Sequence, residues 1–398
     1  MVLGFSSGLP LALTGGTLQA WATVENVALQ SIGFLTLIGT AYTLKFLWAP
    51  LIDRYAPPLL GRRRGWVVCT QLLLAVFIAC MGLFNPGSSL WVLAALAVVV
   101  AFLSATQDIA FDAYSTDVLR KDERAAGAAL KVLGYRLAMI VSGGLALVLA
   151  DQWLGWGSMY FVMGGLMAVC ALATVFAPEP EVVVAAPRSL KSAVVEPFIE
   201  FFSRPGAWSL LLLIVLYKLG DAFAGALSTT FLLRGVGFSV SEVGTINKVF
   251  GLAATIVGAL AGGALMARLG LYRALLLFGL LQAVSNLGYW ALAVMPPNVV
   301  VMGIVVAGEN LCGGLGTAAF VALLMALCNH QFSATQFALL SALSAVGRTY
   351  LAGPFTPPLV ESLGWPGFFL LTVVIALPGI ALLWWRRAYL RALDQDPA

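Results

Sequence analysis

The sequence predicts an all-α integral membrane protein whose twelve transmembrane helices form two six-helix bundles related by pseudo-two-fold symmetry. Hydrophobic residues make up 61% of the 398 residues and charged residues only 10%, with a mean hydropathy of +0.96. A soluble domain averages about 45–50% apolar and about 25% charged residues, so a water-soluble core does not explain this chain. Apolar runs of about 20 residues, the length that spans a bilayer, recur along the whole sequence, and their pattern repeats in two halves.

Each apolar run is expected to be a helix, because backbone N–H and C=O groups in lipid must pair within their own segment. The predicted helices span residues 2–22, 31–52, 66–84, 89–117, 124–150, 157–177, 206–233, 241–267, 273–294, 297–328, 333–360 and 366–385. The chain is therefore predicted to cross the membrane twelve times.

The two halves are separated by APEPEVVVAAPRSLKSAVVEPF, the longest polar, proline-containing segment. Short sequences recur at corresponding places in each half, as in LADQWLGWGSMYF at 149–161 and LVESLGWPGFF at 359–369. Two copies of six helices run the same way through the membrane, and such a parallel repeat is typical of transporters. We therefore expect an N-terminal bundle at 1–177, a cytoplasmic linker at 178–205, and a C-terminal bundle with a short cytoplasmic tail at 206–398.

The distribution of basic residues predicts the orientation of the chain. Most of the 22 Lys and Arg residues fall on one side of the predicted membrane, whereas only Arg234 falls on the other. By the positive-inside rule, both termini and the middle loop of this multi-pass protein are cytoplasmic. Since the basic residues are explained by topology, we expect no nucleic-acid partner.

Ionisable side chains also occur inside the predicted helices. A charge at the membrane centre costs at least about 2.5–3.5 kcal/mol, so it persists where it meets water or a partner. Every third predicted helix has no such charge in its apolar stretch, so we expect the other helices to surround a polar pathway. The charged residues inside helices are Asp108, Asp112, Asp221, Glu309, Lys45, Lys131, Arg136, Lys218, Lys248 and Arg348.

The segment SATQDIAFDAYSTDVL carries two of these carboxylates on one helical face. Asp108 and Asp112 are four residues apart, and Gln107 lies beside Asp108. A carboxyl in apolar surroundings can take up and release a proton near neutral pH, so Asp108, the deeper of the two, is the predicted proton-coupling residue. The alternative is that Asp108 or Asp112 pairs with Lys131 or Arg136 on the next helix and only holds two helices together.

Two candidate groups lie in the second half. Glu309 and Asn310 sit in AGENLCGGLGTAAF, where glycines favour either a bent helix beside a substrate site or tight helix packing. Lys218 and Asp221 are three residues apart, so they can neutralise each other or take part in function. Glu309 and Asp221 are therefore the further candidates for proton coupling.

The sequence excludes the common enzyme classes. GFSSG at 4–8 matches G-x-S-x-G, but it opens a predicted membrane helix and the single histidine, His330, is predicted in a distant loop. GLGTAA at 314–319 imitates a dinucleotide-binding motif without a preceding strand. The five cysteines lack metal-binding spacing. We expect no catalytic residues, no metal and no cofactor.

The loop after the second predicted helix, IDRY followed by GRRRGW, resembles the signature loop of the major facilitator superfamily. In that superfamily an Asp-Arg pair and a Gly-Arg-Arg group latch neighbouring helices on the cytoplasmic side. The matching residues, a candidate cytoplasmic gate loop, are Asp53, Arg54, Gly61, Arg62 and Arg63, and APPLL lengthens the gap between them. The alternative is a basic loop that only fixes topology.

Seven further segments, spread over nearly the whole chain, resemble the AmpG muropeptide permeases: GFSSGLPLALTGGTLQAW, KFLWAPLIDRY, SATQDIAFDAY, VLGYRLAM, LYKLGDAFA, ENLCGGLGTAAFVALLMALCN and QFALLSALSAVGR. This resemblance implies the major facilitator fold and import of N-acetylglucosaminyl-anhydro-N-acetylmuramyl peptides across the bacterial inner membrane. These wall fragments are recycled in the cytosol and read as a signal for β-lactamase induction. The resemblance also implies that the proton gradient drives uptake, with Gln107 and Asp108 carrying that role.

A muropeptide has sugar faces, amides and carboxylates, which basic and aromatic side chains can bind. The candidate substrate-binding residues are Gln107, Asp112, Lys45, Tyr42, Lys131, Arg136, Tyr217, Lys218, Lys248, Asn310 and Arg348. We expect a monomer in the lipid bilayer that contains the complete twelve-span transport unit. The alternatives are a carrier of another anionic cargo, such as an acyl-coenzyme A, or a receptor that binds wall fragments without moving them.

Overall fold

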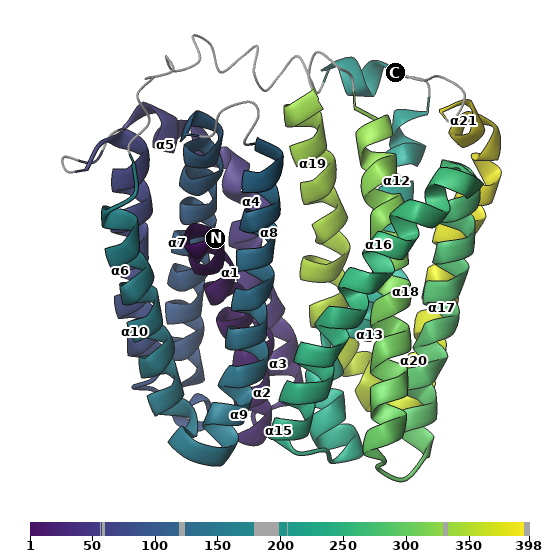
Figure 1. The fold of residues 1–398 in the computed structure, drawn as a ribbon. Coiled ribbons are helices and arrows are strands. Elements are labelled where there is room, and N and C mark those ends of the chain that lie inside the picture. The colour runs from purple at the N-terminus through teal and green to yellow at the C-terminus, as the bar shows by residue number, and fades with distance from the viewer. Residues whose placement is uncertain are drawn as a thin grey trace. The chain divides into compact units, whose positions relative to one another are not determined.

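The computed structural model describes residues 1–55, 57, 60–118, 124–178, 199–204, 206–328 and 333–393. All regular secondary structure in these residues is helical (Figure 1). Within the same residues, eight segments are long and apolar enough to cross a membrane.

These eight segments contain ten of the twelve predicted crossings, from the predicted helix at 66–84 onward. Segments 130–175 and 336–385 are 46 and 50 residues long, and each covers two predicted helices. Each is interrupted by a glycine with positive φ, Gly155 (70°) or Gly364 (67°), a conformation that glycine adopts without strain. The first two predicted helices are present but are broken into shorter pieces, so neither forms one long segment.

The chain divides into two compact units. The first comprises Met1–Ala186 and Ser239–Val249, and the second comprises Pro187–Phe238 and Phe250–Ala398. The domain limits expected from the sequence stay a prediction, and residues 179–198 and 205 of the expected linker lie outside the described residues.

The first unit is built around α1, which packs against α7 and α8, while α6 packs along α10 (Figure 1). Glycine permits the close approach of α1 to α8, because a Cβ on Gly8 would lie 2.5 Å from the carbonyl oxygen of Tyr135. Leu13, Ile78 and Met163 lie in its apolar core. Its elements are α1 (Val2–Thr14), α2 (Gly16–Val24), α3 (Leu29–Phe34), η1 (Leu35–Gly39), α4 (Thr40–Leu44), η2 (Lys45–Leu47), α5 (Ala49–Arg54), α6 (Arg62–Met81), α7 (Pro86–Val118), α8 (Arg124–Ile140), η3 (Val141–Leu145), α9 (Ala146–Leu149), η4 (Ala150–Leu154), α10 (Gly155–Val175), α15 (Val240–Glu242) and most of η6 (Val243–Phe250).

The second unit has the same all-helical character, with α18 packed between α16 and α17 (Figure 1). In its core Tyr217 stacks on Phe320, with ring centroids 5.6 Å apart, and the Tyr217 hydroxyl donates to the Leu275 carbonyl oxygen at 3.0 Å. Its elements are α12 (Ala207–Tyr217), α13 (Leu219–Ala226), α14 (Ser228–Thr230), η5 (Phe231–Val236), α16 (Gly251–Leu269), α17 (Leu271–Val294), α18 (Val299–Ala326), α19 (Ser333–Val346), η8 (Gly347–Ala352), α20 (Gly353–Trp385) and α21 (Arg387–Ala392).

Candidate functional site

Asp108 lies half-buried on α7, facing α1. The Ser7 hydroxyl on α1 donates a 2.5 Å hydrogen bond to Asp108 Oδ1. Lys45, in the short 3-10 turn η2, lies close enough for its positive charge to act on the carboxylate. Asp108 is therefore a partly buried carboxylate that has both a hydroxyl donor, Ser7, and a nearby cation, Lys45.

Gln107, next to Asp108, lies in a buried contact among three helices. Its Nε2 donates to Ser6 Oγ at 2.8 Å, and Gln71 Nε2 on α6 donates to the same oxygen at 2.8 Å. The Ser6 hydroxyl in turn donates to the Leu3 carbonyl oxygen at 2.9 Å. Gln107 is fully buried, so in this structure it holds α7 against α1 and α6.

Asp112 and Lys131 form an ion pair between α7 and α8. The Lys131 ammonium also lies 4.8 Å from the centroid of the Phe111 ring. This pair matches the alternative in which Asp112 pairs with Lys131 and holds two helices together. Asp108 has a different neighbour, Ser7, so the two carboxylates of one helical face have different environments.

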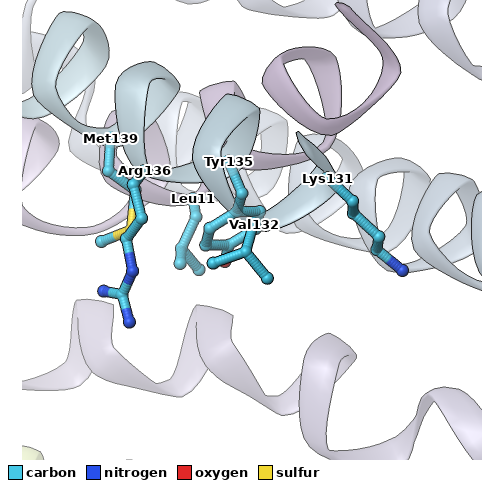
Figure 2. A pocket seen from close by; sticks show the side chains of 6 residues that line it. All are labelled: Leu11, Lys131, Val132, Tyr135, Arg136 and Met139. Carbon is cyan, nitrogen blue, oxygen red and sulfur yellow. The ribbon is translucent and has the colours of Figure 1, made fainter. Parts of the chain in front are cut away.

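A cavity of about 370 Å³ opens beside these groups in the first unit (Figure 2). One wall residue comes from α1 and five come from α8: Leu11, Lys131, Val132, Tyr135, Arg136 and Met139. The volume is in the range of small-molecule sites, about 300–1,000 Å³. In Figure 2 the guanidinium of Arg136 and the ammonium of Lys131 extend in different directions.

Arg136 is the cation of this cavity that remains open to a ligand. Lys131 is paired with Asp112, whereas Arg136 has no carboxylate partner among the residues that the structure describes. A guanidinium binds a carboxylate through two parallel N–H groups, so Arg136 is suited to hold an anionic ligand.

In the second unit the predicted polar residues fall into two groups. Lys218 Nζ lies 3.5 Å from Asp221 Oδ2 and donates to Thr317 Oγ1 at 3.2 Å. The expected pair therefore exists, between the start of α13 and the residue before it, and also reaches α18. Glu309 Oε2 accepts from Asn310 Nδ2 at 3.0 Å and from the Tyr289 hydroxyl at 3.4 Å.

Asn310 further links two helices, because its Oδ1 accepts from Thr255 Oγ1 on α16 at 2.9 Å. The side chain thereby makes contacts within the protein on both of its amide atoms, since Nδ2 also donates to the Val306 carbonyl oxygen at 2.9 Å. Its predicted role in substrate binding stays a prediction.

Four of the predicted basic residues lie where the helices are irregular. Lys45 begins the 3-10 turn η2, and Lys218 separates α12 from α13 with φ −97° and ψ −1°. Lys248 lies in the π-helical segment η6 and Arg348 in the π-helical segment η8. Irregular backbone at membrane depth is tolerated where it is buried in protein or lines a cavity, and π-helical turns often mark functional sites. The sequence alone did not predict that these basic residues would lie at irregular segments of the helices.

The two predicted tyrosines are packed inside the protein. Tyr217 lies 6% exposed against Phe320, and Tyr42 packs against the core of the first unit. Either ring would need to move before it could stack on a sugar. Their role in substrate binding stays a prediction.

The predicted gate loop is described only in part. The backbone of Asp53 and Arg54 ends α5, and Gly61, with φ 76°, precedes Arg62 at the start of α6. The side chains of Asp53, Arg54 and Arg62 lie outside the described part of the chain, and Arg63 is partly buried at the start of α6.

Arg64, which sequence reasoning did not single out, makes the contact expected of a latch. Its Nη1 donates to the Ala177 carbonyl oxygen at 2.6 Å and to that of Val175 at 3.3 Å, where α10 ends. The arginine thus ties the start of α6 to the end of α10 and satisfies carbonyl groups that a helix end leaves unpaired. The signal in the sequence was the third arginine of GRRRGW.

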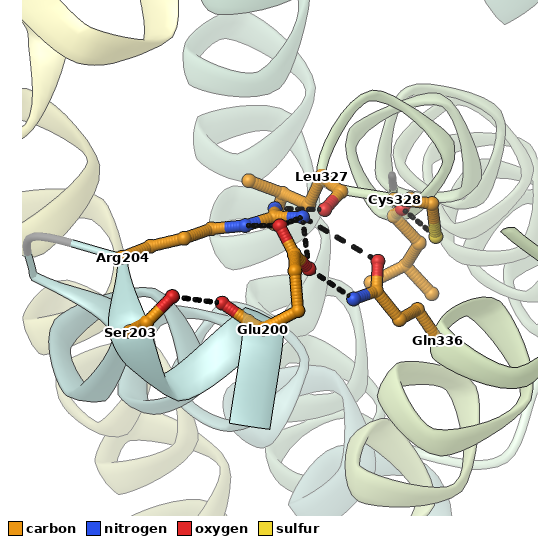
Figure 3. Close-up of polar contacts among 7 residues, drawn as sticks. Glu200, Ser203, Arg204, Leu327, Cys328 and Gln336 are labelled. Atoms are coloured by element: carbon orange, nitrogen blue, oxygen red, sulfur yellow. Dashed lines mark hydrogen bonds and ion pairs between the residues drawn. The ribbon is translucent and has the colours of Figure 1, made fainter. Parts of the chain in front are cut away.

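A second arginine does the same in the other unit (Figure 3). Arg204 Nη1 donates to the Leu327 carbonyl oxygen at 2.5 Å, at the end of α18, while Nη2 pairs with Glu200 Oε2 at 2.7 Å. Gln336 on α19 donates to the same Glu200 carboxylate, so the cluster joins the segment before α12 to α18 and α19.

Replacing Arg204 by Ala is expected to destabilise the second unit by about 2 kcal/mol, because it leaves the Glu200 carboxylate and the Leu327 carbonyl without their charged donor. The side chains of Arg204 and Glu200 are only 21% and 27% exposed, so water replaces the lost donor incompletely. The midpoint of thermal unfolding in detergent measures the effect. Glu200→Gln, which keeps an acceptor, serves as the milder control, and equal midpoints for Arg204→Ala and the unmodified protein would refute a stabilising role.

The sequence profile of the family described as Major Facilitator Superfamily matches residues 1–350. The chain is 62% identical over 383 residues to the anhydromuropeptide permease of Escherichia coli strain K12, which covers 96% of this chain and 78% of that protein. It is 38% identical over 398 residues to an uncharacterized protein of Haemophilus influenzae, with coverage of 96% and 92%.

Among solved structures, a bacterial homologue of the human lysosomal transporter Spinster, inward-facing and unoccupied, has the same fold. The TM-score is 0.77 at 17% identity, and the match covers 100% of this chain and 96% of that chain. Together with the family match, this likeness confirms the predicted all-α transporter fold.

Proposed function

This chain belongs to the Major Facilitator Superfamily and, within it, to the family of the AmpG anhydromuropeptide permeases, and from that premise we propose that it imports anhydromuropeptides by proton symport. The chain is a transporter and not an enzyme. The observation that carries the choice of cargo is the high identity to the Escherichia coli permease along nearly the whole chain. N-acetylglucosaminyl-anhydro-N-acetylmuramyl peptides are then the transported wall fragments, serving cell-wall recycling and the signal for β-lactamase induction.

The cavity of the first unit supports an anionic, peptide-containing cargo. Arg136 stands in its wall without a carboxylate partner among the described residues, so it is the residue we propose for the peptide carboxylate. The apolar side chains of Leu11, Val132 and Met139 offer a surface for the less polar faces of the sugar rings. Lys45, Lys248 and Arg348 are further candidates for the remaining carboxylates.

We propose that the proton gradient is the driving force and that no cofactor takes part. Asp108 takes up the proton in this scheme, because it is an ionisable group at the junction of α1 and α7 that accepts a hydrogen bond from Ser7 and lies near Lys45, whereas Asp112 forms an ion pair with Lys131. Glu309 and Asp221 are the other candidates. In this proposal the protein lies in the bacterial inner membrane with both termini on the cytoplasmic side. It works as a monomer in the bilayer.

Competition in proteoliposomes tests the cargo. Labelled anhydromuropeptide is offered outside vesicles that contain the purified protein and an imposed inward proton gradient. We expect uptake that is inhibited by unlabelled anhydromuropeptide and unaffected by coenzyme A compounds. Inhibition by acyl-coenzyme A would favour the carrier of another anionic cargo, and saturable binding without uptake would favour a receptor.

A further inference from the structure

We propose that Ser7 is a positioning residue that transmits the charge state of Asp108 to α1 and, through α1, to the wall of the cavity. This inference rests on the proposed role of Asp108 as the proton-coupling group. It concerns a residue outside the set that the sequence motifs predict as site residues.

The first step is the contact itself. Ser7 is 6% exposed, and its hydroxyl lies 2.5 Å from Asp108 Oδ1, across the boundary between α1 and α7. A hydrogen bond to an ionised carboxylate is shorter and about twice as strong as one between neutral groups. Protonation of Asp108 therefore weakens the tie between α1 and α7, and deprotonation restores it.

The second step is the position of Ser7 on α1. Ser7 and Leu11 are one helical turn apart and lie on the same helix face, and Leu11 forms the α1 contribution to the cavity wall. A shift of α1 at Ser7 therefore moves the cavity wall. A change in the protonation of Asp108 would thus reach the cavity wall through Ser7 and Leu11.

The third step is that α1 is built to shift. Pro10 lies inside α1, where it removes a backbone donor, and Gly15, with φ −108° and ψ −107°, separates α1 from α2. Two such interruptions within nine residues of Ser7 allow this half of the crossing to move without disturbing α2.

The neighbouring serine provides an alternative arrangement. Gln71 and Gln107 both donate to the Ser6 oxygen, and this leaves Oε1 of each amide buried without a hydrogen-bond partner. Two buried unpaired acceptors are costly, so this network is not at its best-satisfied arrangement. A rotation of the Ser6 hydroxyl from the Leu3 carbonyl oxygen toward either amide oxygen would satisfy one of them, so the network has a second possible arrangement.

Three charged side chains act on Asp108 in this part of the structure. They are Lys45 from η2, Asp112 on the same helix and Lys131 from α8. None of them is altered by a substitution at Ser7, so a change in coupling in such a variant reports on the hydroxyl.

The test compares Ser7→Ala, Asp108→Asn and the double variant in proteoliposomes. Two rates are measured with labelled anhydromuropeptide: accumulation under an inward proton gradient, and exchange across the membrane without a gradient. For Ser7→Ala we expect accumulation to fall about tenfold, equivalent to about 1.4 kcal/mol, with exchange within about twofold of the unmodified protein. Ser7→Thr, which keeps the hydroxyl, is expected to restore accumulation.

The double variant separates this role from a general packing effect. If Ser7 acts through Asp108, then Ser7→Ala changes nothing further in the Asp108→Asn background. Unchanged accumulation in Ser7→Ala overturns the inference, as does an exchange rate without a gradient that Ser7→Ala lowers by the same factor, more than about twofold, in both backgrounds. In each case a loss in Asp108→Asn alone leaves the proposed proton coupling standing.

A spectroscopic readout does not depend on the cargo. In infrared difference spectra between low and high pH, the carboxyl C=O band that disappears in Asp108→Asn belongs to Asp108. Loss of the hydroxyl donor in Ser7→Ala is expected to move this band to higher wavenumber. An unmoved band refutes the hydrogen bond as a coupling contact even if transport of the muropeptide itself is never observed.

Discussion

Asp108→Asn is expected to abolish proton-driven accumulation of anhydromuropeptide while the protein remains folded and inserted. The amide has nearly the volume of the carboxyl and its Oδ1 can still accept from Ser7, so the packing of α1 on α7 is preserved. The amide cannot take up a proton in the relevant pH range. Cargo movement then loses its link to the proton gradient, and only equilibration remains.

The measurement is uptake into proteoliposomes with and without an inward proton gradient. Asp112→Asn is the matched control, because Asp112 lies one turn along the same helix but is paired with Lys131. It removes the same charge and is expected to lower the rate without uncoupling transport. If Asp108→Asn accumulates cargo as well as the unmodified protein, Asp108 is structural and coupling must be sought at Glu309 or Asp221.

Gly258→Val is expected to destabilise the second unit by about 3 kcal/mol, the upper end of the usual cost of overpacking. A Cβ on Gly258 would lie 3.0 Å from Leu311 Cα and would overlap the Leu311 carbonyl oxygen, so the clash is with backbone that cannot rotate away. Gly314 on α18 makes the reciprocal contact, where a Cβ would lie 2.8 Å from the Ala259 backbone nitrogen. Adding a branched side chain must separate α16 from α18.

The control is Gly263→Val on the same helix, since a Cβ there would meet nothing within 4 Å. Valine has a slightly better helix propensity than glycine, so this variant is expected to stay within about 0.5 kcal/mol of the unmodified protein. Thermal unfolding in detergent and the yield of monodisperse protein measure both. Equal loss in the two variants would show that helix propensity or lipid contact, rather than the close approach of α16 and α18, sets the cost.

Some features of the site could be predicted because they depend on local spacing. The face shared by Asp108 and Asp112 follows from helical periodicity, and the pairing of Asp112 with Lys131 was one of the two alternatives that this periodicity allowed. The pairing of Lys218 with Asp221 follows in the same way from their separation of three residues. Sequence spacing cannot tell which alternative holds, because that depends on which helices are neighbours.

Other features had no local signal. GFSSG was notable in the sequence only as an imitation of a hydrolase motif, yet in the structure Ser6 and Ser7 make the buried hydrogen bonds to Gln71, Gln107 and Asp108. Each of the first two crossings was predicted only as a range, 2–22 or 31–52; in the structure α1 and α2 are separate helices and the second crossing is divided among α3, η1, α4, η2 and α5. Apolar composition predicts that a segment crosses the bilayer, but it does not predict where backbone hydrogen bonds rearrange around a charged residue such as Lys45.

The sequence by itself determined the class of protein, the twelve crossings and the family, because hydropathy and chain length are properties that a bilayer selects directly. Only the tertiary structure decided which polar groups meet: Ser7 with Asp108, Arg64 with the end of α10, Arg204 with the end of α18, and Arg136 with a cavity. The physical reason is that buried polar groups are satisfied by whichever helix packs beside them, and residues 101 positions apart, as in the contact of Ser7 with Asp108, become neighbours through packing alone.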